Sequence, residues 1–495
     1  MSAADGRPHP PGRYDVVVVG SGPGGLQTSY YLGRYGVSHA LVSADDAPGG
    51  MFRRFPVFDR LISWTKPDAP FEPGTREYES YDHNSLLAED PAHRALVPRY
   101  MDRAFDVPAR PEMEAGLEAF AERAGVLVRY GCRWEATRRD DDGLVLTTSD
   151  GEYRCAAAVF AVGVTEPWKG GIPGAEHAPH YVETKKPSAY RGKRLVIVGK
   201  RNSGFELANG LLPWAREIVL VSPRPVRFGV LARSPLRVRY LQPYEEYVRG
   251  GSGALVVDAA IERIERNEAG YVVRTKGTTW PGDLDFEADE VIVATGFGTA
   301  LADLRELGVA TTRDGRIPAQ TPFWESVSAP GVFFAGNATQ GAAGLQKQGL
   351  AANSTAVNGF RYNARVLARH IAERLGYARP RPILRPEALV PYLLAELARA
   401  PELWIQKGYL ARVVTFTDAG IRDDGILPLE HFVDSIGEDS AAVAVEMDGN
   451  GTIYPAVYVR RGGRLNEHHL DPHPTYAFDG EPQRAALEAL LGPLG

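Results

Sequence analysis

Cysteine is nearly absent from this chain of 495 residues, which contains only Cys132 and Cys155. The two stand far apart and form no Cys-x-x-Cys pair. A paired redox thiol is therefore not expected, because such chemistry needs two neighbouring cysteines. We interpret both residues as buried structural thiols.

Long hydrophobic runs and an excess of positive charge are also missing. No apolar stretch approaches the roughly 18 residues that a membrane span needs, and residues 1–11 hold no hydrophobic segment typical of a secretion signal. The formal net charge is −6, so composition gives no reason to expect nucleic acid or an anionic membrane as a partner. We predict a cytoplasmic globular protein that is long enough for several domains.

Glycine, in contrast, is concentrated where it is informative. The chain reads Asp15-Val-Val-Val-Val-Gly20-Ser21-Gly22-Pro23-Gly24-Gly25, a buried strand followed by the start of a helix. Gly20, Gly22 and Gly25 form the Gly-x-Gly-x-x-Gly turn, which lets the backbone approach a pyrophosphate at the helix N-terminus. We assign this turn to FAD.

An imperfect second copy of the turn follows about 180 residues later. It reads Arg194-Leu-Val-Ile-Val-Gly199-Lys-Arg201-Asn202-Ser203-Gly204, with Arg201 where the second glycine is expected. A side chain there would crowd a pyrophosphate unless its guanidinium pairs with it. Two such turns predict two dinucleotides, a flavin and the nicotinamide that reduces it.

The residues after the second strand of each unit bear on the nucleotide. An acid normally holds the adenosine ribose about 20 residues after the turn. Ser43 stands in that place and Asp45 follows, and either could bond the ribose. In the second unit Arg224 and Arg227 follow the strand, which suits the 2′-phosphate of NADPH and favours it over NADH. A solvated basic loop is the alternative.

The order of strands and helices predicts an α/β protein with two Rossmann-like dinucleotide-binding domains, for FAD and NADPH, and an extra C-terminal α+β region. We expect a strand near residues 126–130 and a helix from about 345 to 375. The predicted parts are residues 14–185 and 291–378 for the FAD domain, 186–290 for the NADPH domain and 387–495 for the C-terminal region.

Further motifs occur in a fixed order: Ala47-Pro-Gly49-Gly50-Met51-Phe52, Ala161-Val-Gly163, Ala294-Thr295-Gly296-Phe297 and Phe334-Ala-Gly336-Asn337. With them, residues 14–375 resemble the flavoproteins with two dinucleotide-binding domains, which include thioredoxin reductase and the flavin-containing monooxygenases. The resemblance implies that the first motif lies beside the flavin and that the next two mark crossings between domains. It also implies that Asn337 replaces an acid that holds the ribityl chain; asparagine still donates and accepts hydrogen bonds.

The complete set of expected cofactor-binding residues is Gly20, Ser21, Gly22, Pro23, Gly25, Ser43, Asp45, Gly50, Met51, Phe52, Trp134, Ala161, Gly163, Gly199, Arg201, Asn202, Ser203, Arg224, Arg227, Thr295, Gly296, Gly336, Asn337 and Gln346.

Residues 48–110 form a long irregular segment, and such segments are usually functional. Part of it, residues 58–66, resembles a stretch of the flavin-containing monooxygenases in which an asparagine lies over the flavin; Trp64 takes that place here. The segment looks closer still to the FAD-dependent oxidoreductase-domain family. The resemblance implies that Trp64 covers the flavin and that Lys66 or Asn84 polarises oxygen or a substrate. Packing and capping roles are the alternative.

The resemblance implies a monooxygenase in which a flavin C4a-hydroperoxide oxygenates a small soft nucleophile such as an amine, without a metal or a nucleophilic side chain. The expected partners are a small-molecule substrate and oxygen, and a homodimer stays open. One alternative is an NADPH-dependent flavin reductase or oxidase that oxygenates nothing. The other is a flavin-stabilised binding protein in which residues 387–495 contact a partner.

Histidines and acids gather at Glu467-His468-His469-Leu-Asp471-Pro-His473 near the C-terminus. Their spacing matches no strong zinc pattern, and no cysteine assists them. We predict a structural hairpin or an interface here rather than a metal site, while a pocket wall or a dimer contact stays open.

Overall fold

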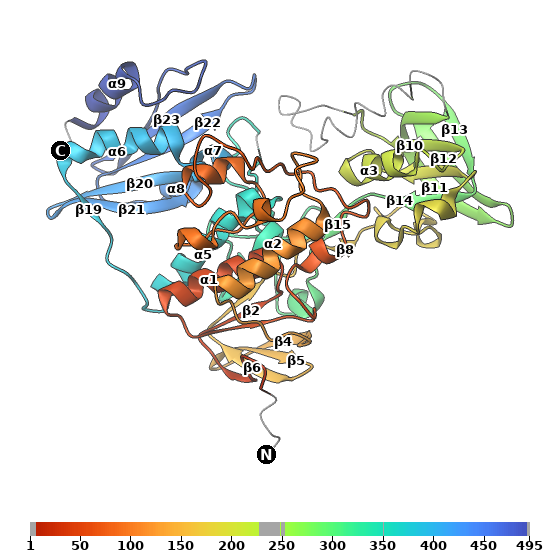
Figure 1. Ribbon diagram of the computed structural model, residues 1–495, viewed down its shortest axis with the longest axis horizontal. Helices are drawn as coiled ribbons and strands as arrows, with labels where there is room; N and C mark the ends of the chain where they lie inside the picture. The colour runs from red at the N-terminus through yellow and green to blue at the C-terminus, as the bar shows by residue number, and fades with distance from the viewer. Residues whose placement is uncertain (1–5, 227–247, 249–252, 350, 493–495) are drawn as a thin grey trace. The chain divides into compact units, whose positions relative to one another are not determined.

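The computed structural model describes residues 6–226, 248, 253–349 and 351–492 (Figure 1). Contacts between residues divide the chain into two compact units. The larger unit comprises Met1–Arg54, Ser63–Val164 and Thr299–Gly495, and the smaller unit comprises Phe55–Ile62 and Thr165–Gly298. This division is coarser than the four parts expected from the sequence, which stay a prediction.

A four-stranded parallel sheet forms the centre of the larger unit. Its order is β18-β7-β2-β3. All four valines of β2 are buried, as expected for a parallel strand that is covered on both faces. Helix α1 follows β2 and lies beside α5 (Figure 1). The bounds are β2 Val16–Val19, α1 Pro23–Tyr35, β3 His39–Val42, β7 Ala157–Phe160, β18 Val332–Phe334 and α5 Val357–Arg374.

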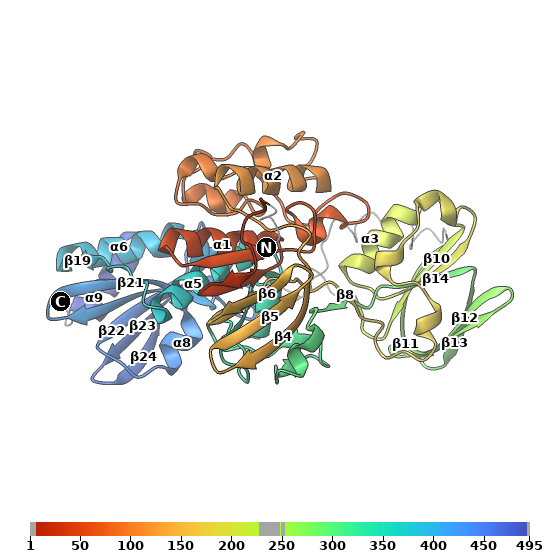
Figure 2. The same cartoon turned by 90° about the horizontal axis from the view of Figure 1, so that it is seen from below.

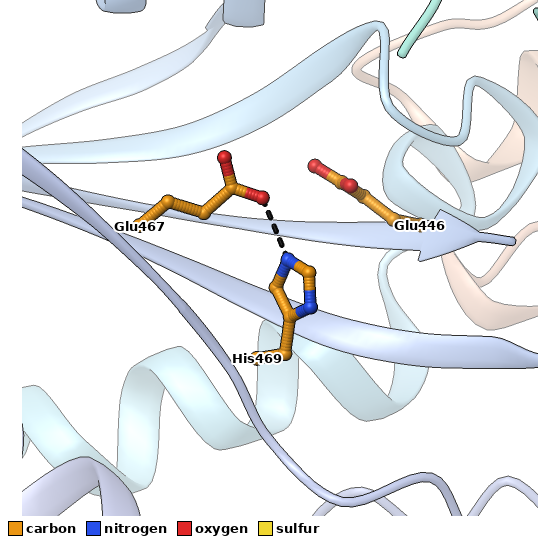
Figure 3. Close-up of side chains that lie close together, drawn as sticks. All are labelled: Glu446, Glu467 and His469. Carbon is orange, nitrogen blue, oxygen red and sulfur yellow. Dashed lines mark hydrogen bonds and ion pairs between the residues drawn. The ribbon is translucent and has the colours of Figure 1, made fainter. Parts of the chain in front are cut away.

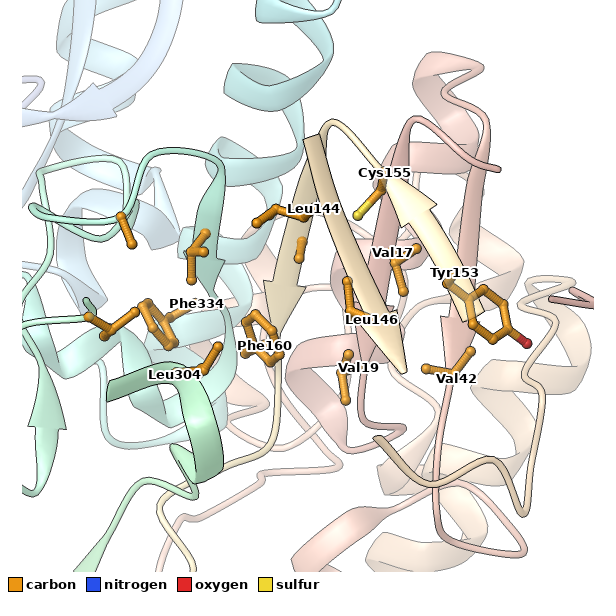
Figure 4. Close-up of a cluster of buried hydrophobic side chains, with 14 of the residues drawn as sticks. Val17, Val19, Val42, Leu144, Leu146, Tyr153, Cys155, Phe160, Leu304 and Phe334 are labelled. Carbon is orange, nitrogen blue, oxygen red and sulfur yellow. The ribbon is translucent and has the colours of Figure 1, made fainter. Parts of the chain in front are cut away.

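A second sheet packs against this one. Its order is β1-β6-β5-β4, and Figure 2 shows β4, β5 and β6 next to one another. Val17 and Val19 of β2 share a core with Leu144 and Leu146 of β5 (Figure 4). This core packs β2 against the three antiparallel strands formed by residues 134–155. The bounds are β1 Gly12–Arg13, β4 Trp134–Asp140, β5 Gly143–Thr148 and β6 Gly151–Cys155.

Two sequence expectations about single elements are wrong. Residues 126–130 form no strand; only an isolated bridge joins Arg129 to Val42, between Gly125 and Gly131, which both have positive φ. The helix expected from about residue 345 begins at Val357. The described residues before it, 342–349 and 351–356, are irregular, and side chains of the C-terminal region hold several of them, as described below.

The irregular segment after β3 contains only short helices before α2. They are η1 Gly50–Arg53, η2 Glu77–Tyr81, η3 Pro91–His93 and η4 Val97–Arg99, followed by α2 Arg110–Arg123. Gln27 of α1 ties this segment to the central sheet, because its side-chain amide both donates to Leu87 O at 2.8 Å and accepts from Leu87 N at 2.6 Å.

The smaller unit repeats the strand–turn–helix pattern. Its sheet has the order β13-β12-β11-β10-β9-β14, in which β14, β9, β10 and β11 run parallel. Residues 55–62 belong to this unit: Phe58 N donates to Glu206 Oε1 at 3.3 Å. The bounds are β8 Glu166–Pro167, β9 Arg194–Val198, α3 Asn202–Leu211, β10 Glu217–Ser222, β11 Ala254–Asn267, β12 Gly270–Gly277, β13 Asp283–Ala288, β14 Glu290–Val293 and β15 Phe297–Gly298.

The C-terminal region adds a six-stranded sheet to the larger unit, in the order β19-β21-β20-β22-β23-β24. Helix α6 lies on one face, where Arg412 of β20 bonds to Glu396, and α8 packs on the other with Ala411 and Val413. The bounds are β19 Ile383–Leu384, α6 Pro386–Arg399, α7 Pro401–Ile405, β20 Leu410–Thr417, β21 Gly420–Pro428, α8 Leu429–Asp434, β22 Ser440–Met447, β23 Ile453–Arg461, β24 Arg464–His469 and α9 Glu481–Leu491.

The remaining short elements are η5 Ala175–His177, η6 Tyr181–Glu183, η7 Pro187–Tyr190, η8 Ala302–Arg305, β16 Thr311–Thr312, β17 Ile317–Pro318 and η9 Gly336–Gly341. Within the ranges given above, no helix combines the length and the apolar character needed to cross a membrane.

Helix α5 carries three arginines at four-residue spacing, which places them along one side of the helix. Arg361 donates to the carbonyl oxygens of Asp82, Ser85 and Glu79 at 2.7–2.8 Å. Arg365 bonds to Glu402 of α7, and Arg369 donates to the carbonyl oxygens of Asp424 and Ile426 on β21. One helix thus joins the irregular segment to the C-terminal sheet.

Glu402 is the buried acid of this arrangement. Its Oε2 lies 2.9 Å from Arg76 Nη2, and Arg365 bonds to its Oε1. Burial alone would raise the pKa of Glu402, but the charges of Arg365 and Arg76 outweigh it and hold the pKa well below its ordinary value. The ionised form is therefore the one that stabilises the fold.

We predict that Glu402→Gln lowers the free energy of unfolding by about 3 kcal/mol, because it removes a buried carboxylate that pairs with Arg365 and Arg76, of which only Arg76 keeps a second acid, Glu396. Urea unfolding at neutral pH measures the loss. Since a depressed pKa stabilises only while the carboxyl is ionised, the difference should shrink as the pH falls through that pKa. Glu387→Gln, at the exposed start of α6, is the control. Equal stability of both variants would contradict the interpretation.

Candidate functional site

The first glycine turn is built by contacts that leave no room for side chains. A Cβ on Gly25 would lie 1.8 Å from Gly20 O, and one on Gly20 would lie 2.6 Å from Ala161 O. A Cβ on Gly24 would lie 2.4 Å from both N and Cα of Gly336. The turn is therefore packed tightly between the ends of β2 and β7 and the start of η9.

Gly22 differs from these three glycines. Its backbone is extended (φ −69°, ψ 175°), which any residue adopts, and a Cβ would meet nothing closer than Gly50 Cα at 3.8 Å. The fold itself thus makes no use of a missing side chain at Gly22. This is the position whose bareness serves the pyrophosphate in a dinucleotide site, and α1 begins at the next residue, Pro23. The turn fits FAD.

Ser21 and Ser43 are both buried and bonded to each other, with 2.8 Å between their Oγ atoms. Ser43 Oγ also accepts from the backbone N of Asp45 at 3.2 Å. Asp45 itself is half-buried. The hydroxyl of Ser43 is thus engaged in holding the end of β3, while Asp45 lies nearer to solvent.

Other expected flavin-side residues gather around the same turn. Gly49 N donates to Ser21 O at 3.0 Å, and a Cβ on Gly50 would lie 3.0 Å from Gly22 Cα, so η1 with Met51 and Phe52 starts beside the turn. Gly163 follows Ala161 with φ +77°. Gly336 packs on Gly24, and the half-buried Asn337 comes next.

Two expected residues lie apart from these contacts. Trp134 packs on Phe160 of β7, with 4.7 Å between ring centroids, and its Nε1 donates to Thr137 Oγ1. Gln346 is exposed, has φ +47° and donates to Ala343 O. Among the described residues neither side chain forms a hydrogen bond or ring contact with the turn, and their cofactor roles stay predictions.

The second turn, in the smaller unit, repeats the backbone of the first. A Cβ on Gly204 would lie 2.0 Å from Gly199 O, and one on Gly199 would lie 2.4 Å from Ala294 O. Gly199 N donates to Val221 O at 2.8 Å, the same distance as from Gly20 N to Val42 O in the first turn. Two turns of one construction therefore stand in two units.

The second turn departs from the first at its inner positions. Arg201 has extended backbone and is exposed, and Asn202 and Ser203 open helix α3 after it. Lys200 is buried and bonds to Val257 O at 2.8 Å and to Asp258. Burial lowers the pKa of Lys200, although Asp258 opposes the shift.

Arg224 follows β10 and is exposed, which leaves its guanidinium accessible to a phosphate. Arg227 lies outside the described residues. Thr295 and Gly296 follow the end of β14: Thr295 Oγ1 donates to Trp168 O, and Gly296 O accepts from Trp168 N at 3.1 Å and His180 Nε2 at 3.0 Å. These bonds join the residues after β14 to Trp168 and His180 within the smaller unit.

The three expected catalytic residues lie close together in the larger unit. Asn84 is buried and its Nδ2 donates to Ser63 O and Thr65 Oγ1, both at 2.9 Å. Trp64 is 36% exposed and its ring lies 4.3 Å from that of His83. Lys66 is exposed. Asn84 thus fixes the loop, and Trp64 and Lys66 are the members that face outward.

Sequence reasoning missed the groups that hold this loop. Asp82 Oδ1 accepts from Thr65 Oγ1 and from the backbone N of Asn84, both at 3.0 Å. Asp82 Oδ2 and Asn84 Oδ1 are buried with no partner among the described residues. Arg361 of α5, far along the chain, donates to the carbonyl oxygen of Asp82. The four-residue spacing of Arg361, Arg365 and Arg369 in one helix was the available signal.

Both cysteines lie in the core of the larger unit. Burial raises the pKa of Cys132, and it raises that of Cys155 to about 12. A thiol acts as a nucleophile only as its thiolate, which a raised pKa disfavours. Neither cysteine is suited to reduce a disulphide.

Two dinucleotide turns, each between a parallel strand and a helix, define a flavoprotein oxidoreductase of the FAD- and NAD(P)-binding class. Comparison with known families agrees: the model described as "Pyridine nucleotide-disulphide oxidoreductase" matches residues 17–336. The chain belongs to this family. The resemblance drawn from the sequence motifs is thereby confirmed, as are the α/β fold and the expectation of an NAD(P)-dependent flavoprotein enzyme.

Individual relatives are more distant. The mouse protein named "FAD-dependent oxidoreductase domain-containing protein 2" is 31% identical over 233 residues, which are 45% of this chain and 34% of that protein. The chain thus spans about a third of that relative. A ferredoxin–NADP reductase of Thermus thermophilus is 27% identical over 337 residues, 65% of this chain and 84% of that one.

Solved structures show the same fold. A flavin-containing monooxygenase from Stenotrophomonas maltophilia has a TM-score of 0.56 at 20% identity and covers 73% of this chain and 99% of its own. The cadaverine monooxygenase DfoA of Erwinia amylovora has a TM-score of 0.56 at 15% identity, with 75% and 97% covered.

We predict that Gly22→Val yields a folded protein without FAD, because its Cβ would meet nothing closer than Gly50 Cα at 3.8 Å, while the side chain would occupy the approach to the pyrophosphate. Absorbance of the purified protein gives the flavin content, and circular dichroism confirms folding. Gly437→Val is a matched control, since its Cβ meets nothing within 4 Å and its φ, like that of Gly22, is not positive. Full flavin content in Gly22→Val would refute the assignment.

We predict that Arg224→Glu raises the dissociation constant for NADPH roughly tenfold or more and leaves that for NADH nearly unchanged, because a charged hydrogen bond to the 2′-phosphate contributes about 1.5–3 kcal/mol. Flavin reduction at increasing nucleotide concentration measures both constants. Lys276→Glu, on the exposed side of β12, controls for net charge. Equal weakening of both nucleotides would remove the argument for the 2′-phosphate.

Proposed function

We propose that this protein is an FAD-containing, NADPH-dependent monooxygenase that oxygenates a small soft nucleophile, with N-hydroxylation of an amine as the reaction class. One observation carries the proposal: two equivalent dinucleotide turns occur in a chain whose two cysteines are buried and unpaired in sequence. Such a chain has no cysteine relay to a disulphide substrate, so oxygen is the favoured electron acceptor.

The bound flavin would take a hydride from NADPH and deliver its two electrons to oxygen, so that one oxygen atom enters the substrate and the other leaves as water. Overall, the substrate, oxygen, NADPH and one proton give the oxygenated substrate, NADP⁺ and water. The protein has to bind both nucleotides, orient the substrate and exclude water.

On the flavin side, the backbone at Gly22 and the amides that open α1 hold the pyrophosphate through their N–H groups and the helix dipole. Asp45 holds the adenosine ribose, because it is half-buried and carries a carboxylate, whereas Ser43 is buried and accepts from Ser21 Oγ and Asp45 N. Asn337 binds the ribityl chain with its side-chain amide.

On the nicotinamide side, Arg201 pairs with the pyrophosphate that a glycine would otherwise admit, and Arg224 pairs with the 2′-phosphate. Both side chains are exposed and carry a permanent charge. The combination favours NADPH over NADH.

At the reacting end, Trp64 and Lys66 face the substrate, and Asn84 positions them. The support for this division is the burial of Asn84 and its two bonds to the backbone and side chain of residues 63 and 65. Trp64 covers the reacting centre against water, and the ammonium group of Lys66 orients an electron-rich group.

The second candidate is an NADPH-dependent flavin reductase. Its support is the alignment with 84% of the Thermus thermophilus protein, which is named a ferredoxin–NADP reductase. The tryptophan at position 64, in place of the asparagine of the flavin-containing monooxygenases, also favours it.

We predict that NADPH oxidation by the purified protein accelerates when a primary diamine such as cadaverine is added, and that labelled oxygen enters the amine. Mass spectrometry of the product under isotopically labelled oxygen detects the transfer, and a peroxide assay measures uncoupled turnover. The flavin-free Gly22→Val protein is the blank. Peroxide equal to the NADPH consumed, with every amine and thioether tested, would contradict oxygenation and favour the reductase.

A further inference from the structure

The C-terminal region has no part in the proposed chemistry, and it lies outside residues 17–336 of the family match. Some of its contacts reach the irregular segment that joins η9 to α5, of which residues 342–349 and 351–356 are described and which is called segment 342–356 below. This segment follows η9, whose second residue is Asn337. What the C-terminal region does to it therefore bears on the flavin site.

Helix η9 is tied to the glycine turn at its start and to α5 at its middle. Gly336 lies so close to Gly24 that a Cβ on Gly24 would be 2.4 Å from the backbone of Gly336. Thr339 Oγ1 donates to Gly336 O at 2.7 Å and accepts from Asn363 Nδ2 at 3.0 Å. A displacement of the segment beyond η9 would therefore reach the pyrophosphate turn.

Lys347 is the one long cation of the described part of this segment, and it enters an acidic cluster on the C-terminal sheet. Its Nζ lies 2.5 Å from Glu467 Oε1 and 3.3 Å from Glu446 Oε1. Lys347 also bonds to Tyr458, whose ring centroid is 4.5 Å from Nζ. The three partners come from β24, β22 and β23, so a single side chain binds three strands.

Glu446, Glu467 and His469 point toward one another (Figure 3), and their ligand atoms lie within 4.8 Å. The figure also shows the bond of 2.6 Å between His469 Nε2 and Glu467 Oε1. A divalent metal could use such a set. However, the ammonium group of Lys347 already lies against both carboxylates, and a metal would place two positive charges beside it. The acidic cluster therefore serves as the binding site of the Lys347 ammonium group.

Two more side chains of the C-terminal region hold the ends of the segment. Tyr409 OH donates to Ala342 O at 3.2 Å, and its ring lies 2.6 Å from where a Cβ on Gly344 would be. Gln406 Oε1 accepts from Asn353 N at 2.8 Å, and Gln406 Nε2 donates to Asn363 Oδ1 at 2.8 Å. The segment is thus fixed at its start, middle and end by one region.

We propose that residues 387–495 are a positioning region for the flavin site: by anchoring Lys347, Ala342 and Asn353 they hold segment 342–356, and with it Asn337, in the conformation that binds FAD. Lys347 is a positioning residue in this scheme. The inference rests on the proposed FAD site. It gives the C-terminal region a role inside the enzyme rather than at the surface of a partner.

The test is Lys347→Met in the full chain, with FAD titrated into the flavin-free protein. We expect the dissociation constant for FAD to rise about tenfold, the change that corresponds to about 1.4 kcal/mol, and the visible absorbance of bound flavin to change shape. Lys347→Arg keeps the charge and should restore both. Lys276→Met is the control for a lost surface lysine.

A mutant cycle decides whether the effect passes through the acidic cluster. Glu467→Gln should weaken FAD binding as Lys347→Met does, and the double variant should be no weaker than either, because residues that act through one contact are not additive. Additive losses would overturn the anchoring role. An unchanged FAD constant and spectrum in Lys347→Met would overturn it as well.

Two further outcomes are separable. If the unaltered protein binds no FAD, the proposed function fails before the anchoring is tested, and that result is visible in the first titration. If Zn²⁺ binds the unaltered protein tightly, and Glu446→Gln abolishes this, the cluster is a metal centre and the anchoring role is overturned. We expect no such tight Zn²⁺ binding, because Lys347 occupies the cluster.

Discussion

The larger unit depends on three arginines of α5, of which Arg361 is buried and Arg365 and Arg369 are half-buried. The three stand at four-residue spacing, and each binds a different part of the chain. Arg361 binds the loop at residues 79–85, Arg365 binds Glu402 of α7, and Arg369 binds carbonyl oxygens of β21. A buried guanidinium group is costly unless all of its bonds are made. These three parts therefore cannot shift independently, and the irregular segment with Trp64 acquires a fixed backbone although it has almost no regular structure.

The two glycine turns show how one backbone solution serves two nucleotides. In each turn the outer glycines allow a strand and a helix to meet at distances that no side chain tolerates, and the same carbonyl contacts recur at Ala161 and Ala294. The inner position is where the turns differ. Packing within the protein does not require a glycine at position 22, whereas the corresponding position of the second turn carries the charged side chain of Arg201. The proposed division into a flavin site and a nicotinamide site rests on this one position of a shared frame.

How well the sequence predicted each feature depends on how local its cause is. The strands before the turns and the turns themselves follow from neighbouring valines and glycines, and the structure has them where they were expected. The start of α5 was predicted about 12 residues too early, because segment 342–356 is held by Gln406, Tyr409 and Glu446, far along the chain. The contacts of Asn84 were hidden for the same reason: they depend on a loop folding back on itself.

The sequence by itself determined the class of this protein, since glycine spacing and strand composition act over a few residues and are written in order along the chain. It also determined that no cysteine pair is available, which removes one electron acceptor. Only the tertiary structure decided that Asp45 lies nearer to solvent than Ser43 and that Asn84 holds a loop. It also decided that Lys347 binds side chains of the C-terminal sheet. Those facts depend on burial and on bonds between distant residues, and neither quantity is a property of a local stretch of sequence.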